Sequence, residues 1–285
     1  MDIRQITVVG AGTMGHGIAQ IAAMGGFGVK LVDVSRDVLL AAKEQVEKNL
    51  RKGVELRKVD PSHLSDSLER IELCTELDEA AKETDLVIEA VPEELPLKRE
   101  LFSRLDKLAP LGTILATNTS TLSPGEIGSA TDRPGQVVGM HFFNPVHIMR
   151  LVEVVRSLAT SDETLDVALN VAQQMGKETV VVDESPGFVT SRISALVGNE
   201  AFYMLMEGVA DAGDIDRAVK LGLNYPMGPL ELADLVGLDV RLRNLEYLHR
   251  MLGEKFRPCP LLVKYVRAGR LGRKTGRGVY NYVED

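Results

Sequence analysis

The sequence contains no tryptophan, only two cysteines, and no apolar run that approaches the length of a membrane span. Cys74 and Cys259 are too few and too far apart for a zinc site or a disulfide framework, so we expect ordinary thiols and no metal site. Because a spanning helix needs about 20 consecutive apolar residues, we expect no membrane partner. Acidic residues outnumber basic ones, 41 against 33, and the net charge of −8 argues against general binding to nucleic acid.

The length and composition are those of an ordinary globular protein. The 285 residues, 45% of them apolar and 26% charged, are enough for a substantial core and for two domains. Residues 1–4 lead directly into an apolar run, which leaves no room for a signal or transit peptide. Together with the expected free thiols, this predicts a cytoplasmic protein.

A glycine-rich turn follows the first predicted strand, residues 3–9. It reads Gly10-Ala11-Gly12-Thr13-Met14-Gly15, and a helical pattern over residues 18–22 comes next. In this motif Gly10 permits the tight turn, Gly12 lets a pyrophosphate approach the backbone, and Gly15 lets the helix pack close to the sheet. The helix N-terminus then offers free N–H groups to the phosphates. Such a turn also occurs without a nucleotide, but its place between a strand and a helix favours dinucleotide binding.

The second predicted strand, residues 29–32, ends in Asp33. An acid at this place accepts hydrogen bonds from the adenosine ribose hydroxyls and repels a 2′-phosphate. We therefore expect NAD rather than NADP as the cofactor. Arg36, three residues later, is the feature that leaves NADP open.

Polar residues also follow the next predicted strands, residues 71–74, 86–90 and 114–117. Glu93 lies in the loop after the fourth strand, Lys98 opens a helix, and Asn118 and Ser120 follow the fifth strand. In an open α/β sheet, ligands bind at the carboxyl ends of the strands. We therefore expect these four side chains at one cleft.

Residues 38–57 predict a long helix, and its later part and the residues just after it form the densest basic region of an acidic chain. The basic residues are Lys43, Lys48, Arg51, Lys52, Arg57 and Lys58. They form either a solvated helix face or an anion-binding surface.

Two further strands are predicted on either side of Asn144-Pro145, at residues 137–140 and 151–155. Proline disfavours the helical region for the residue before it, so this dipeptide indicates a turn. Strands joined so closely can pair, and Glu153 would then lie opposite His141. A carboxylate bound to one ring nitrogen fixes the tautomer and leaves the other nitrogen as a proton acceptor. The alternative is a half-buried strand-end histidine and an exposed glutamate.

The pattern of elements changes near residue 184. After a last strand at residues 179–182, the chain is helical from about residue 189, with a helix start at Asp214-Ile215-Asp216, a loop at residues 224–229 and a short strand at 278–282. We predict a Rossmann-like α/β domain over residues 1–184, with a mostly parallel sheet of about eight strands, and an all-helical domain over residues 185–285. A helical domain this small often gains burial by oligomerising, so we expect a homodimer through it.

Several of these motifs together resemble the 3-hydroxyacyl-CoA dehydrogenases, nearest their bacterial 3-hydroxybutyryl-CoA branch. The resemblance covers essentially the whole chain and rests on the glycine turn, Asn118-Thr119-Ser120, His141-Phe142-Phe143-Asn144-Pro145, Leu151-Val152-Glu153-Val154-Val155, Ser185-Pro186-Gly187-Phe188, residues 222–229 and Gly272-Arg273-Lys274-Thr275-Gly276-Arg277-Gly278-Val279-Tyr280. It implies reversible, NAD-dependent oxidation of a short-chain (S)-3-hydroxyacyl-CoA to a 3-oxoacyl-CoA, in fatty-acid or butyrate metabolism.

The resemblance also assigns roles to single residues. His141 matches the catalytic base, Glu153 its carboxylate partner, and Ser120 the serine that contacts the substrate oxygen. Cofactor contacts fall on the glycine turn, Asp33 and five further positions: Glu93, Lys98, Ser120, Asn144 and Lys274. The coenzyme A region falls on Lys48, Arg51 and Lys52.

The chain departs from the family pattern at Ser191. The family usually has asparagine there, in Pro-Gly-Phe-Val-x-Asn-Arg, near the substrate. A serine hydroxyl either reaches the substrate through water or makes a weaker contact.

Two other functions remain open at this stage. One is a dehydrogenase of free β-hydroxy acids using a lysine on the helix after residue 189, although residues 189–207 contain no lysine. The other is a cofactor-binding protein with a structural or redox-sensing role.

Overall fold

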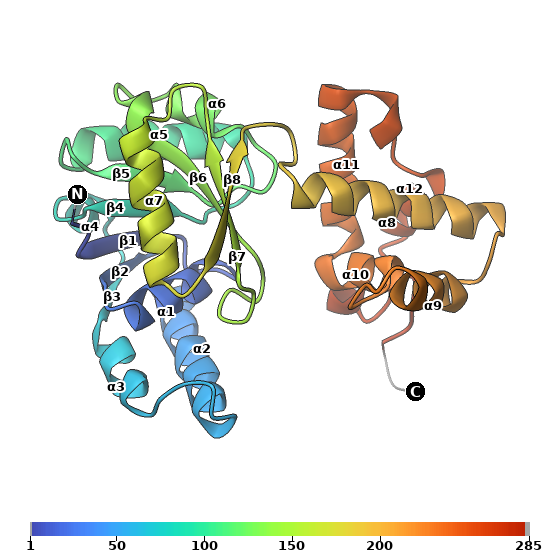
Figure 1. Ribbon diagram of the computed structural model, residues 1–285, viewed down its shortest axis with the longest axis horizontal. Helices are drawn as coiled ribbons and strands as arrows, with labels where there is room; N and C mark the ends of the chain where they lie inside the picture. The colour runs from blue at the N-terminus through green and yellow to red at the C-terminus, as the bar shows by residue number, and fades with distance from the viewer. Residues whose placement is uncertain (1, 283–285) are drawn as a thin grey trace. The chain divides into compact units, whose positions relative to one another are not determined.

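The computed structural model describes residues 2–282, and the chain divides into two compact units, Met1–Ser185 and Pro186–Asp285 (Figure 1). Within residues 2–282, all eight strands belong to the first unit, and the second unit is built from helices. No helix within residues 2–282 is both long and apolar enough to cross a bilayer.

The first unit is built on one sheet with the strand order β3-β2-β1-β4-β5-β6-β7-β8. All neighbouring strands are parallel except β6 and β7, which are antiparallel. The predicted mostly parallel sheet is therefore confirmed. The strands are β1 Gln5–Val9, β2 Gly28–Val32, β3 Ile71–Cys74, β4 Leu86–Glu89, β5 Ile114–Thr117, β6 Val137–Phe142, β7 Leu151–Arg156 and β8 Glu178–Asp183.

Helices cover both faces of this sheet because its central strands are apolar on both faces, as parallel strands usually are. Along β1, Ile6 and Val8 face one core, while Val9 faces the other. The first core lies under α1 Gly15–Met24, α2 Arg36–Glu55, α3 Ser62–Glu69 and α7 Asp162–Gln174. The second lies under α4 Leu77–Ala81, α5 Leu95–Leu108 and α6 Pro124–Gly128. One 3₁₀ turn, η1 Pro134–Gln136, leads into β6.

The second unit packs its helices around a core of its own. Phe202, Leu230, Leu245, Leu248 and Phe256 are all at most 1% exposed. The helices are α8 Thr190–Glu207, α9 Ala212–Gly222, α10 Pro229–Val236, α11 Leu238–Leu252 and α12 Pro260–Arg267, with 3₁₀ turns η2 Glu254–Phe256 and η3 Arg273–Thr275.

Two sequence predictions for this unit need correction. Helix α9 begins at Ala212, ahead of the predicted start, because the Asp211 side chain accepts a hydrogen bond from the Asp214 N–H at 2.8 Å and caps the helix. The predicted strand at 278–282 is wrong: this segment has only isolated bridges within residues 2–282. Its N–H groups at Val279 and Tyr280 donate to the Asp234 carboxylate, each at 2.9 Å, in place of a strand partner.

Candidate functional site

The glycine turn after β1 is as tight as its sequence requires. Gly10 has φ +97°, a conformation that favours glycine. A Cβ on Gly15 would lie 1.7 Å from the Gly10 carbonyl oxygen, so α1 can start this close to the turn only without a side chain there. The Asp33 carboxylate accepts hydrogen bonds from the Ala11 N–H at 2.9 Å and from the Ser35 N–H at 3.0 Å. Asp33 therefore joins the turn to the start of α2.

A cavity of about 960 Å³ opens beside this turn, at the carboxyl ends of β1, β2 and β4. Chain connectivity reverses direction across the sheet between β1 and β4, which is where doubly wound sheets bind ligands. Five predicted cofactor residues line it: Gly10, Gly12, Thr13, Met14 and Asp33. A Cβ built on Gly12 would meet nothing within 4 Å, so the backbone there is open to a close ligand. The residues present therefore fit a dinucleotide.

A buried ion-pair network lies at the end of β4. Lys98 Nζ lies 2.5 Å from Glu89 Oε1 and 3.3 Å from Glu93 Oε2, and the Lys98 and Glu89 side chains are at most 1% exposed. Glu89 also accepts from the Val91 N–H at 2.8 Å and the Thr117 hydroxyl at 2.7 Å. Burial raises the pKa of the Glu89 carboxyl, and Lys98 and Thr117 only partly offset this effect. The network fixes the loop that leaves β4.

Glu93 connects that loop to the segment after β5. It accepts from the Thr119 hydroxyl at 2.6 Å, the Ser120 N–H at 2.9 Å and the Thr121 N–H at 3.2 Å. Burial favours its neutral form, but Lys98 and the bonds from Thr119 and Ser120 outweigh this and lower the pKa of the Glu93 carboxyl. The structure thus brings the predicted residues Glu93, Lys98 and Ser120 together.

His141 and Glu153 are paired as predicted. They are opposite residues in the antiparallel β6–β7 ladder, and His141 Nδ1 lies 2.7 Å from Glu153 Oε2. The Glu153 side chain is 0% exposed and that of His141 is 8% exposed. The short bond across the ladder fixes the imidazole plane, and the Phe143 ring lies 4.4 Å from the imidazole, centroid to centroid. Asn118, after β5, accepts a hydrogen bond from the Phe142 N–H at 2.9 Å and so joins this strand to the Ser120 segment.

The remaining predicted residues take no part in the hydrogen bonds and ion pairs described above. Lys48, Arg51 and Lys52 are exposed on α2, and each pairs with a glutamate of that helix: Glu44, Glu47 and Glu55. Asn144 is joined to Pro145 by a cis peptide bond in the β6–β7 loop. In the second unit, Ser191 is half-buried in the first turn of α8, and Lys274 Nζ donates to Asp239 Oδ1 at 2.6 Å. The roles of these residues remain predictions.

Two residues of the first unit were not anticipated. Glu89 ends the apolar strand β4 and is the centre of the buried network. A carboxylate at the end of a fully apolar strand is the sequence signal that identifies it, because a buried charge needs a partner. Lys177 is 8% exposed, and its ammonium donates to the Val146 and Met149 carbonyls at 2.5 and 2.8 Å, so it holds the loop after Asn144-Pro145. No sequence signal separates it from a surface lysine.

A doubly wound sheet, a glycine turn with an acid at the end of β2, and a buried His–Glu pair at the same edge define the class of protein: an NAD-dependent dehydrogenase. Matches to two family models identify the family within this class. Residues 5–185 match the 3-hydroxyacyl-CoA dehydrogenase NAD-binding domain, and residues 187–282 match the 3-hydroxyacyl-CoA dehydrogenase C-terminal domain. The chain belongs to the 3-hydroxyacyl-CoA dehydrogenase family.

Individual relatives match this chain over most or all of their lengths. The chain is 49% identical over 285 residues to a probable 3-hydroxybutyryl-CoA dehydrogenase of Bacillus subtilis, covering 100% of this chain and 99% of the relative. It is 40% identical over 287 residues to the mitochondrial hydroxyacyl-coenzyme A dehydrogenase of Homo sapiens, covering 98% and 91%. The crystal structure of (S)-3-hydroxybutyryl-CoA dehydrogenase from Ralstonia eutropha has a TM-score of 0.95 at 42% identity, with 99% and 100% coverage.

Proposed function

We propose that this protein is an NAD-dependent dehydrogenase of short-chain (S)-3-hydroxyacyl-CoA, with 3-hydroxybutyryl-CoA as a substrate and the 3-oxoacyl-CoA as product. The observation that carries the proposal is the 2.7 Å contact between His141 and Glu153, both buried, beside a sheet edge shaped for a dinucleotide. The relatives named for this reaction support the same substrate.

The proton chemistry falls to His141 and Glu153. His141, held through Nδ1, takes the proton of the substrate's 3-hydroxyl at Nε2, and the Glu153 carboxylate stabilises the imidazolium that forms. Ser120, held by Glu93 through its backbone N–H, orients the reacting oxygen. Bound NAD supplies the hydride acceptor; the protein supplies position and electrostatics. In the reverse direction His141 returns the proton.

Other parts of the proposal concern binding and assembly. Residues 1–184 would bind the cofactor through the glycine turn, Asp33, Glu93, Lys98 and Asn144. Lys274, on the other unit, would add a cofactor contact, and Ser191 a substrate contact. Lys48, Arg51 and Lys52 would meet coenzyme A after leaving their glutamate partners, and the helical unit would form a homodimer. The free thiols Cys74 and Cys259 suit a cytoplasmic protein.

The test is oxidation of NADH by the purified protein with acetoacetyl-CoA. We expect turnover with this thioester and little with acetoacetate, which lacks coenzyme A. Positioned general-base catalysis is worth about 10²–10⁴ in rate, so His141→Gln should lower kcat by about that factor while NADH binding is kept. Full activity of His141→Gln would disprove the assignment of the base. Efficient use of acetoacetate, or NADH binding with no turnover, would instead favour one of the two other functions.

A further inference from the structure

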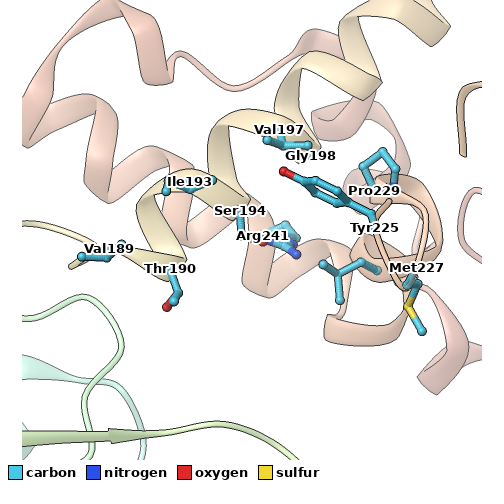
Figure 2. Close-up of a pocket in the computed structure, with 11 residues that line it drawn as sticks. Val189, Thr190, Ile193, Ser194, Val197, Gly198, Tyr225, Met227, Pro229 and Arg241 are labelled. Carbon is cyan, nitrogen blue, oxygen red and sulfur yellow. The ribbon is translucent and has the colours of Figure 1, made fainter. Parts of the chain in front are cut away.

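The second unit contains a pocket that the proposed chemistry does not use. It lies between α8, α10, α11 and the loop that precedes α10, and its volume is about 260 Å³ (Figure 2). Val189, Ile193 and Tyr225 on its wall are 47, 53 and 39% exposed, so apolar side chains form its accessible part. Val197, Leu232 and Pro229 continue the apolar lining.

One cation is part of this apolar wall. Arg241, from α11, lines the pocket and is 8% exposed. Its Nη1 donates to the Ser194 hydroxyl of α8 at 2.7 Å, and Figure 2 shows the two side chains next to each other. Within residues 2–282, the buried Nε of Arg241 has no hydrogen-bond partner and the side chain forms no ion pair.

An arginine in this state lacks a counter-charge. Burial lowers the pKa of the guanidinium to about 10, which still leaves it charged at neutral pH. A buried charge is costly unless it is paired, and a serine hydroxyl offers only one neutral acceptor. A guanidinium can donate two parallel N–H···O bonds to one carboxylate. The pocket therefore combines an apolar wall with a cation that lacks a counter-ion, and this combination suits an anion attached to an apolar chain.

We propose that this pocket binds a short aliphatic chain ending in a carboxylate, with Arg241 as the partner of that carboxylate and Ser194 holding Arg241 in place. At about 30 Å³ per water-sized group, the volume admits about eight or nine non-hydrogen atoms, the size of hexanoate. Two sources offer this chemistry. One is the far end of an acyl group in a thioester substrate, which rests on the proposed function; the other is a free short-chain carboxylate.

The binding arm of the test does not depend on turnover. Isothermal titration calorimetry measures binding of hexanoate and of 1-hexanol, which has the chain without the charge, to the full-length protein. Arg241→Met removes the hydrogen bonds from the guanidinium to the charged carboxylate. It should therefore weaken hexanoate binding by at least about tenfold and leave 1-hexanol binding little changed. Arg241→Lys, which keeps the charge, should restore part of the affinity. Arg243→Met is the matched control, because Arg243 is exposed on the same helix.

The kinetic arm identifies the source of the carboxylate. It compares kcat/KM for 3-oxohexanoyl-CoA with that for its analogue carrying a terminal carboxylate, 3-oxohexanedioyl-CoA. If the pocket holds the acyl end, wild type prefers the carboxylate substrate, and Arg241→Met lowers this preference by at least about tenfold. If hexanoate binding needs Arg241 but the preference does not change, the ligand is a free carboxylate.

Equal binding of hexanoate and 1-hexanol to wild type would overturn the proposal. So would unchanged hexanoate affinity in Arg241→Met, or a loss just as large in Arg243→Met. Failure of the proposed function is recognised separately, as the absence of turnover with acetoacetyl-CoA, and the calorimetry is unaffected by it. Circular dichroism and thermal unfolding establish that each variant is folded before it is compared.

Discussion

The contact between Glu153 and His141 makes a quantitative prediction for Glu153→Gln. The substitution keeps the shape of the side chain and removes its charge. Since Oε2 lies 2.7 Å from Nδ1 and Glu153 is 0% exposed, water cannot replace the lost carboxylate. The change therefore acts on the imidazolium that His141 is expected to form during turnover, rather than on a surface charge.

The size of the effect follows from what the carboxylate does. A hydrogen bond to a charged group contributes about 1.5–3 kcal/mol, which corresponds to about a 10- to 150-fold loss of kcat. The glutamine amide can also turn its nitrogen toward Nδ1. That arrangement holds the ring in the opposite tautomer, with Nε2 protonated and unable to accept the substrate proton, and it raises the possible loss to about 10⁴. We therefore expect kcat to fall by at least about tenfold.

Steady-state oxidation of NADH with saturating acetoacetyl-CoA measures this fall in kcat. Glu178→Gln is the matched control: Glu178 lies on the neighbouring strand β8, it is 70% exposed, and its ion pair with Arg150 is at the surface. Because exposed ion pairs contribute little, the control should stay within about threefold of wild type. NADH binding, followed by fluorescence titration, should be similar in all three proteins. A kcat for Glu153→Gln within about threefold of wild type across neutral pH, a difference below about 0.7 kcal/mol, would refute the proton-acceptor role of the pair.

Two further predictions concern the cofactor edge and the loop after β6. Asp33→Asn removes the charge that repels a 2′-phosphate. The ratio of kcat/KM with NADH to kcat/KM with NADPH should therefore fall by about tenfold or more. An unchanged ratio would contradict the role of Asp33. For Lys177, burial lowers the pKa of the ammonium to about 8 from about 10.4 in the unfolded chain. Below pH 8 both states hold the proton, and between pH 8 and 10.4 the unfolded state binds more protons, so the contribution of Lys177 to stability rises with pH. Urea unfolding at pH 8 and at pH 10 measures the free energy of unfolding of wild type and of Lys177→Met. Between these two pH values, the difference between the two proteins should shift by about 2 kcal/mol in favour of wild type. A difference that stays constant would argue against a buried, destabilised ammonium.

Much of the first unit follows from local patterns. The strands at residues 71–74 and 114–117 have the predicted bounds because the strand-forming residues there are followed by polar or turn-forming residues. The pairing of the strands that carry His141 and Glu153 was also predictable, because the connection between them, residues 143–150, is short enough for consecutive strands to lie side by side.

Other features depend on contacts between residues far apart in the sequence. The segment at 278–282 has the composition of a strand, yet Asp234 on α10 takes its N–H groups. The outcome there is decided by a partner that periodicity alone does not identify. The sequence does not predict the buried cation in the pocket of the second unit either, because only the packing of α11 against α8 shows that Arg241 is buried.

The Glu89–Lys98–Glu93 network shows what such buried charges achieve at a site. A buried ion pair adds little net stability, since removing both charges from water costs about as much as their attraction returns. Here the three charged groups instead determine position. Glu89 fixes the backbone at Val91 and the Thr117 side chain, and Lys98 holds Glu93 so that its carboxylate receives the N–H groups of Ser120 and Thr121. An apolar triad of equal volume could pack as well but could not accept those N–H groups. The network therefore holds Ser120 beside the strand that carries His141. Burying three charged groups costs free energy of desolvation, and this positioning of Ser120 is what that cost makes possible.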